Sequence, residues 1–137
     1  TITVNSSKAP CGLFGTLNGA TIKDVNIKDV WSGKGWGSAE LSYNAYNTTF
    51  ENVSISIVAG NVNTGSAGYT PFVSNTMEKC VWKNSSIISS VEIVNVFGAL
   101  KDNDFTGGLT IIANITGDFA VDVSLDSLPD GVVVKKN

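Results

Sequence analysis

The sequence predicts an all-β protein that folds as a short parallel β-solenoid of about four coils, with a C-terminal capping hairpin. Three observations lead to this expectation: a repeated frame, a turn-forming residue at one fixed point of that frame, and an upstream half that occurs twice, at 13–17 and 96–100. Repeats separated by 23 to 32 residues indicate a stacked architecture. The frame occurs at residues 22–27, 50–55, 82–87 and 105–111.

A turn-forming residue follows the large apolar residue that opens each frame. It is Asp24, Asn52 or Asn84 in the first three copies, and Gly108 in the fourth, which has one extra residue. Strand side chains alternate, so two apolar residues three positions apart cannot both face inward on a straight strand. Asp, Asn and Gly adopt left-handed backbone conformations at low cost. We therefore expect a corner at each of these residues, with the corner side chains stacked and hydrogen-bonded along the solenoid. The expected inward positions beyond the corners are Val25, Ile27, Val53, Ile55, Leu109 and Ile111.

The whole chain, 1–137, is predicted to form one β-solenoid domain. Residues 1–11 are expected to form an initial strand or cap, residues 12–113 the four coils, and residues 114–137 the C-terminal cap. Two glycine-rich and polar insertions, at 30–37 and 60–69, are typical of surface loops.

The C-terminal cap is predicted to be a hairpin. Residues 120–125 alternate between apolar and polar side chains, residues 128–131 have turn composition, and residues 132–134 are all Val. Because the ends of a solenoid invite edge-to-edge pairing, a terminal hairpin would protect this end.

A β-sandwich of about eight short strands is the alternative fold. It would join many of its strands by tight hairpins. The strong hairpin signals in this chain are only Asn18-Gly19 and Asp130-Gly131. The solenoid is therefore the preferred interpretation.

Composition excludes several function classes. The chain has no His and no Arg. It has nine Lys and twelve carboxylates, which give a net charge of −3. The basic surface needed for nucleic-acid binding is therefore not expected. No apolar run approaches the roughly 20 residues that span a bilayer. The chain begins at Thr1, and we expect it to be a processed chain or a piece of a longer one.

The two cysteines, Cys11 and Cys80, are expected to remain unpaired. The solenoid frame places them about two strand spacings apart, roughly 10 Å, which exceeds the limit of about 7 Å between the Cα atoms of a disulfide. Buried free thiols that behave as small apolar side chains are the preferred interpretation. Without a His to activate a thiolate, nucleophilic catalysis by either residue is not expected.

Carboxylates that could act together are scarce. Asp102 and Asp104 form the nearest pair, but glycoside hydrolysis needs two carboxylates that face one cleft. Residues 101–104 also lack the later Glu and the spacing of a calcium loop, so we expect a solvated turn. The charged segment 23–30 is interpreted as an exposed strand face. We therefore expect no enzyme activity, no cofactor and no metal.

Aromatic residues in or beside the two insertions are the candidate contact residues. They are Trp31, Trp36, Tyr43, Tyr46 and Tyr69. Such rings can stack on a sugar or anchor a protein partner. They could instead fold back and cover an open coil edge, which is the preferred interpretation. The sequence leaves both roles open.

The segment 12–15, Gly-Leu-Phe-Gly, followed by 19–25, resembles a GLUG-type repeat. Residues 95–98 match it in part, and the two middle coils match it poorly. This family consists of solenoid segments in large cell-surface and secreted proteins. The resemblance implies roles in adhesion, surface display or structural extension, and it carries over no catalytic residue.

Three functions therefore remain, in order of preference. The first is a non-enzymatic extracellular or cell-surface module with a structural or adhesive role. The second is a virion component, such as a phage tail-spike or decoration protein, which would form a trimer with an apolar seam. The third is a carbohydrate-binding module. Polar outward positions favour a monomer or a bead in a longer chain; they are Lys23, Asn26, Glu51, Ser54, Lys83 and Ser86.

Overall fold

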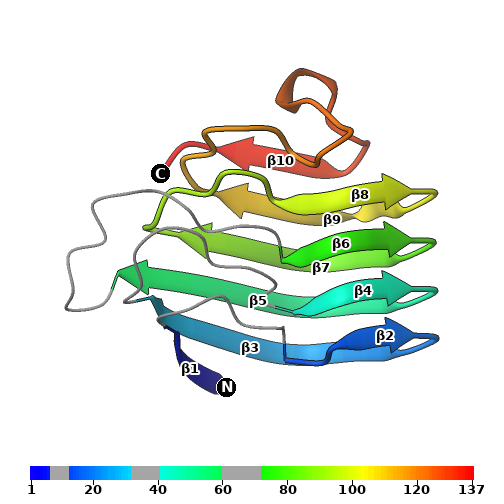
Figure 1. Cartoon of the computed structure of the whole chain (residues 1–137), viewed down its shortest axis with the longest axis horizontal. Helices are drawn as coiled ribbons and strands as arrows, with labels where there is room; N and C mark the ends of the chain where they lie inside the picture. Colours follow the sequence, from blue (N-terminus) through cyan, green and yellow to red (C-terminus); the bar gives the residue numbers. More distant parts are fainter. Residues whose placement is uncertain (7–12, 32–40, 60–71) are drawn as a thin grey trace.

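The computed structural model describes residues 1–6, 13–31, 41–59 and 72–137. Its strands form a six-stranded sheet in the order β1-β3-β5-β7-β9-β10 and a four-stranded sheet in the order β2-β4-β6-β8. The large sheet contains β1 (Ile2–Ser6), β3 (Thr21–Trp31), β5 (Thr49–Ala59), β7 (Val81–Ser89), β9 (Asp104–Ile112) and β10 (Val132–Lys135). The small sheet contains β2 (Thr16–Asn18), β4 (Ser42–Tyr46), β6 (Val73–Glu78) and β8 (Phe97–Lys101). Figure 1 shows the strands stacked in layers from the N-terminus to the C-terminus.

All neighbouring strands within both sheets are parallel, so the predicted parallel all-β class is confirmed. The β-sandwich alternative is wrong, because sandwiches are built from antiparallel sheets. The register follows the repeated frame: Ile27 pairs with Ile55, Ile55 with Ile87, and Ile87 with Ile111. Equivalent residues of the repeat therefore lie above one another.

The core lies between the two sheets and contains the large residues that open the last three frames, Phe50, Trp82 and Phe105, while Ile22 of the first frame is half-buried against it. Phe50 and Trp82 stack with ring centroids 4.3 Å apart. The Trp82 indole N–H donates to Met77 Sδ at 3.3 Å, which gives this buried polar group a partner. Phe105 packs edge-on against Phe119, with centroids 5.7 Å apart. Aromatic stacking thus continues from the middle of the solenoid to its C-terminal end.

The predicted C-terminal hairpin is wrong. Strand β10 pairs parallel with β9, with Val132 beside Leu109, so the chain crosses over the end of the core before it rejoins the sheet. Gly131 has φ of 90°, and a Cβ there would lie 1.9 Å from the Phe105 carbonyl oxygen. Only glycine allows the crossover to approach β9 this closely. A short 3-10 helix, η1 (Leu125–Ser127), replaces part of the expected strand.

The interpretation of residues 23–30 as an exposed face also needs a correction. Lys23, Asn26 and Lys28 are exposed, but Asp29 is fully buried. After the corner at Asp24, alternation turns every second residue inward, and position 29 belongs to the same inward row as Ile27. The charge of Asp29 concealed its inward position in the sequence.

Candidate functional site

The corner residues form a column along the large sheet. Asp24, Asn52 and Asn84 have φ of 56°, 53° and 44°, and Gly108 has φ of 106°. The register places them in successive strands between paired neighbours. Asn52 Nδ2 donates to Asp24 Oδ1 at 2.8 Å, so at least the first step of the column is hydrogen-bonded from strand to strand.

An open hollow of about 340 Å³ lies beside this column. It is lined by Thr1, Asp24, Val25, Asn26, Asn52 and Ser54. Ser54 Oγ donates to Asn26 Oδ1, so part of its hydrogen-bonding capacity is already used within the protein. The lining offers amide and hydroxyl groups with one carboxylate, Asp24. Such a surface can hydrogen-bond a polar ligand, and its described lining residues include one carboxylate where glycoside hydrolysis requires two.

The structure separates the predicted contact aromatics. Tyr43 is 54% exposed and Tyr46 is half-buried, both on β4. Trp31 ends β3, while Trp36 and Tyr69 lie outside the described residues. Tyr46 leads through a short turn into Thr49, whose partner is Thr21, whereas Trp31 pairs with Ala59. The backbone of Trp31 is thus about ten positions along β3 from the Tyr46 end of the sheets, which is at most roughly 33 Å because β3 turns at Asp24.

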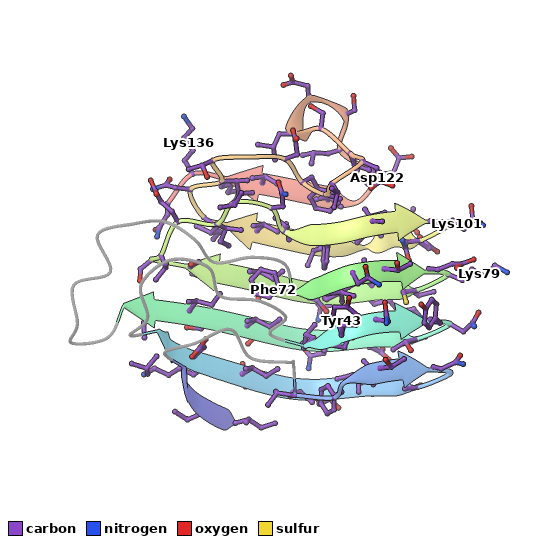
Figure 2. All side chains as sticks on the ribbon, viewed as in Figure 1. Tyr43, Phe72, Lys79, Lys101, Asp122 and Lys136 are labelled. Carbon is purple, nitrogen blue, oxygen red and sulfur yellow. The ribbon has the colours of Figure 1, made fainter. Side chains whose placement is uncertain are left out.

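Tyr43 lies opposite a β-bulge in the neighbouring strand. Ser42 pairs with Val73 and Asn44 with Thr76, so β6 has one more residue than β4 over this interval. Asn75, in the bulge, donates through Nδ2 to Asn44 Oδ1 at 3.0 Å. Bulges re-aim side chains. Figure 2 shows Tyr43 on the small sheet. Its side chain is exposed, and the amide pair joins the next residue of β4 to the bulge of β6.

We call the surface formed by Tyr43, Asn44 and Asn75 the β4–β6 patch. Tyr43 is one of the contact residues predicted from the sequence, whereas the two Asn residues are not. The signal that could have found them is the spacing between apolar residues: four positions separate Val73 from Met77, but three separate Phe97 from Leu100. The patch combines one aromatic ring with amide donors and acceptors, groups that suit a sugar or a polar protein surface.

Asp102 lies in the turn between β8 and β9, and Asp104 is the first residue of β9. Asp104 Oδ1 accepts hydrogen bonds from Thr106 Oγ1 at 2.6 Å and Thr106 N at 2.9 Å. Both hydrogen bonds lower the pKa of Asp104, and the bond from the Thr106 hydroxyl has the larger effect. The positive charge of Lys83 lowers the pKa by a smaller amount. Asn103 accepts from Cys80 N and donates to Met77 O, both at 2.9 Å. The turn is thus stabilised by its own polar groups.

Cys80 is a buried free thiol. Its Sγ lies 3.4 Å from the Ala45 carbonyl oxygen, and desolvation raises its pKa above the ordinary value of 9.0. A thiol of this kind is a poor nucleophile, because the thiolate is the reactive form. Cys11 lies outside the described residues. Among the residues that are described, no group of three His, Cys, Asp or Glu side chains could hold a metal ion.

No protein-family model, curated protein or solved structure matches this chain. The resemblance to a GLUG-type repeat therefore rests on the motif residues alone. Over the described ranges, no helix has the length and apolar character needed to cross a membrane.

Proposed function

We propose that this protein is a non-enzymatic extracellular module with a structural or adhesive role at a cell surface. The observation that carries the proposal is the stack itself. Each strand of the large sheet is held in register by its parallel neighbours, over a continuous row of buried Ile residues. Polar side chains are paired along the outside, as in Asp24–Asn52 and Asn44–Asn75. Repeat stacks of this kind make extended scaffolds that present a surface to partners.

The adhesive part of the proposal is assigned to the β4–β6 patch. Tyr43 is the exposed aromatic residue on β4, and an exposed Tyr flanked by amides can anchor a contact at low conformational cost. The two sheets behind it fix its position, because Ala45 and Met77 beneath the patch are fully buried. A rigid platform of this kind favours binding over catalysis.

Binding to a glycan array and to a panel of extracellular-matrix proteins tests this assignment. We expect Tyr43→Ala to weaken binding by about tenfold or more, the usual effect of losing an aromatic hot spot. Val121→Ala is the matched control, because Val121 is also exposed but lies in the C-terminal crossover. Binding that survives Tyr43→Ala would contradict the assignment.

The same screen distinguishes the carbohydrate-binding alternative from binding at the β4–β6 patch. Sugar binding that is lost in Trp31→Ala plus Trp36→Ala, but retained in Tyr43→Ala, would favour a glycan site at the first insertion. Unchanged far-UV circular dichroism is required of each variant.

The virion alternative receives less support from the outward-facing residues that pair with one another on successive strands of the large sheet. A trimeric spike should have an apolar seam along successive strands. One row contains Lys28, Ser56, Ile88 and Ile112, so only half of its members are apolar. Another row contains Lys23 and Glu51, whose charged groups lie 3.8 Å apart. We therefore rank the surface module above the virion component.

A further inference from the structure

The strands of the two sheets differ in charge. In the large sheet, β3 has exposed charged side chains at Lys23, Asp24 and Lys28, whereas β2 and β4 of the small sheet contain no charged residue. The other two strands of the small sheet contain one each, Glu78 at the end of β6 and Lys101 at the end of β8. These two groups pair with each other at 3.8 Å. The strands of the small sheet therefore present no unpaired charged group to a ligand.

Strand β4 carries two tyrosines on its outer side. Ala45 is fully buried and faces the core, while Tyr43 is 54% exposed and Tyr46 is half-buried. Three strand positions separate the two tyrosines, which is at most about 10 Å. Because β4 pairs with β2 on one side and β6 on the other, both tyrosines are held within the stack and away from its two ends. Two successive pyranose rings of an extended glycan cover about this length, so the two tyrosines can contact different sugars of one chain.

The amide pair beside Tyr43 offers groups that match a sugar hydroxyl. Asn75 Nδ2 donates to Asn44 Oδ1 at 3.0 Å. Within the described part of the chain, Asn44 Nδ2 therefore remains as a donor and Asn75 Oδ1 as an acceptor. A hydroxyl group can donate and accept, so a sugar can use both amides without breaking the bond between them. On the other side of β4, Thr16 pairs with Asn44 and Asn18 with Tyr46, so uncharged polar residues flank this strand there too.

We propose that the ligand of the β4–β6 patch is an uncharged, linear glycan that lies along β4 and is long enough to reach both Tyr43 and Tyr46. This inference rests on the proposed function, because it names the ligand class of the same patch. The two tyrosines stack on different sugars, and the Asn44–Asn75 pair binds hydroxyl groups of the sugar beside Tyr43. A protein partner is less well matched. Protein interfaces pair charged groups across the contact, and the strands of the small sheet offer no unpaired charge for this.

Isothermal titration calorimetry with uncharged oligosaccharides of increasing length tests the proposal. The probes are cello-, manno- and chitin oligosaccharides. For at least one series, we expect the affinity to rise about tenfold with length until the chain reaches both tyrosines, and then to stay constant. Tyr46→Ala should remove this gain and leave binding of the shortest oligosaccharide unchanged, whereas Tyr46→Phe should retain the gain because the ring remains. Asn75→Ala should weaken binding at every length by about fivefold, because a hydrogen-bond acceptor is lost.

Two controls show whether the site and the charge preference are as proposed. Asn26→Ala is the matched control for Asn75→Ala, because Asn26 is also an exposed Asn bonded to a side chain of the next strand, but lies on the large sheet. It should leave binding unchanged. Heparin and oligogalacturonates are charged, and they should bind more weakly than the uncharged series.

The outcomes separate this inference from the proposed function. Binding of an extracellular-matrix protein that depends on Tyr43, without binding of any oligosaccharide, would overturn the inference and leave the proposed function standing. Glycan binding that Tyr43→Ala does not weaken would contradict both. An affinity that does not depend on length, or a gain that survives Tyr46→Ala, would overturn the inference alone. Because Tyr46 is half-buried, its Ala variant must keep the far-UV circular dichroism of the unaltered protein; if it does not fold, the length series on the unaltered protein still decides.

Discussion

At the scale of single residues, the fold depends on side chains that tolerate a left-handed backbone. Six non-glycine residues of the described chain have positive φ, and five of them are Asp or Asn: Asp24, Asn47, Asn52, Asn84 and Asp102. Their polar side chains can bond to the local backbone or to the next layer, which offsets the steric cost of this conformation. The corners are therefore points where local preference and stacking agree.

Substitutions at Asn52 test how the steric cost of a left-handed backbone compares with the hydrogen bond that the side chain makes. Asn52→Ala should lower the free energy of unfolding by about 2 kcal/mol, because alanine at φ of 53° is strained and the bond to Asp24 is lost. Asn52→Gly also loses the bond but avoids the strain, so it should cost clearly less. Urea unfolding of both variants checks the difference. Equal losses would show that the hydrogen bond alone matters at this corner.

Buried hydroxyl groups differ in how well they are satisfied. Ser42 is fully buried, and its Oγ has no hydrogen-bond partner among the described residues. Ser89 is equally buried, but its Oγ donates to Val91 O at 2.6 Å and accepts from Val91 N at 3.1 Å. The two residues therefore form a matched pair.

We expect Ser42→Ala to leave the free energy of unfolding unchanged or to raise it by about 1 kcal/mol, since it removes an unsatisfied polar group. Ser89→Ala should lower it by about 1 kcal/mol or more, because the Val91 N–H loses its acceptor. Thermal and urea unfolding of both variants measure the two effects. A loss of stability in Ser42→Ala as large as that in Ser89→Ala would contradict this assignment.

At the scale of elements, close backbone approach decides how the C-terminal end is closed. The segment after β9 crosses the end of the core, and β10 then adds a parallel strand. The approach of Gly131 to Phe105 is what permits this route. An ordinary side chain at position 131 would push β10 away from β9.

Gly131→Ala should therefore destabilise the protein by about 3 kcal/mol or more, through strain at φ of 90° and a clash with backbone that cannot move aside. Gly19→Ala is the control, because Gly19 has φ of 68° but no atom within 4 Å of the added Cβ. That variant should cost only about 1 kcal/mol. Amide hydrogen exchange should show loss of protection at 132–135 in the first variant alone. Retained protection there would indicate that the crossover tolerates the added methyl group.

At the scale of the whole molecule, the strands of the large sheet are stacked in the order in which they occur along the chain. Contacts between strands join each large-sheet strand to the next one in the sheet, so stability is expected to be distributed layer by layer. Among the described residues, Val123, Leu125 and Leu128 pack on the core at the C-terminal end, whereas Leu13 and Phe14 in the first layer are partly exposed.

The sequence by itself determined the class of fold and the corner positions. Both depend on local physics: alternation sets which residues face inward, and the left-handed preference of Asp, Asn and Gly sets where the chain turns. Residues such as Asn52 and Ile55 therefore carry their structural roles in their own chemistry and spacing.

Only the tertiary structure decided the rest. The crossover before β10, the burial of Asp29 and the separation of Trp31 from Tyr46 all depend on which distant segments become neighbours. Residues 128–131 have the composition of a hairpin turn, yet the close contact of Gly131 with Phe105 leads the chain into a parallel strand. Which segment closes the end of the stack is a non-local property, and no short stretch of sequence contains it.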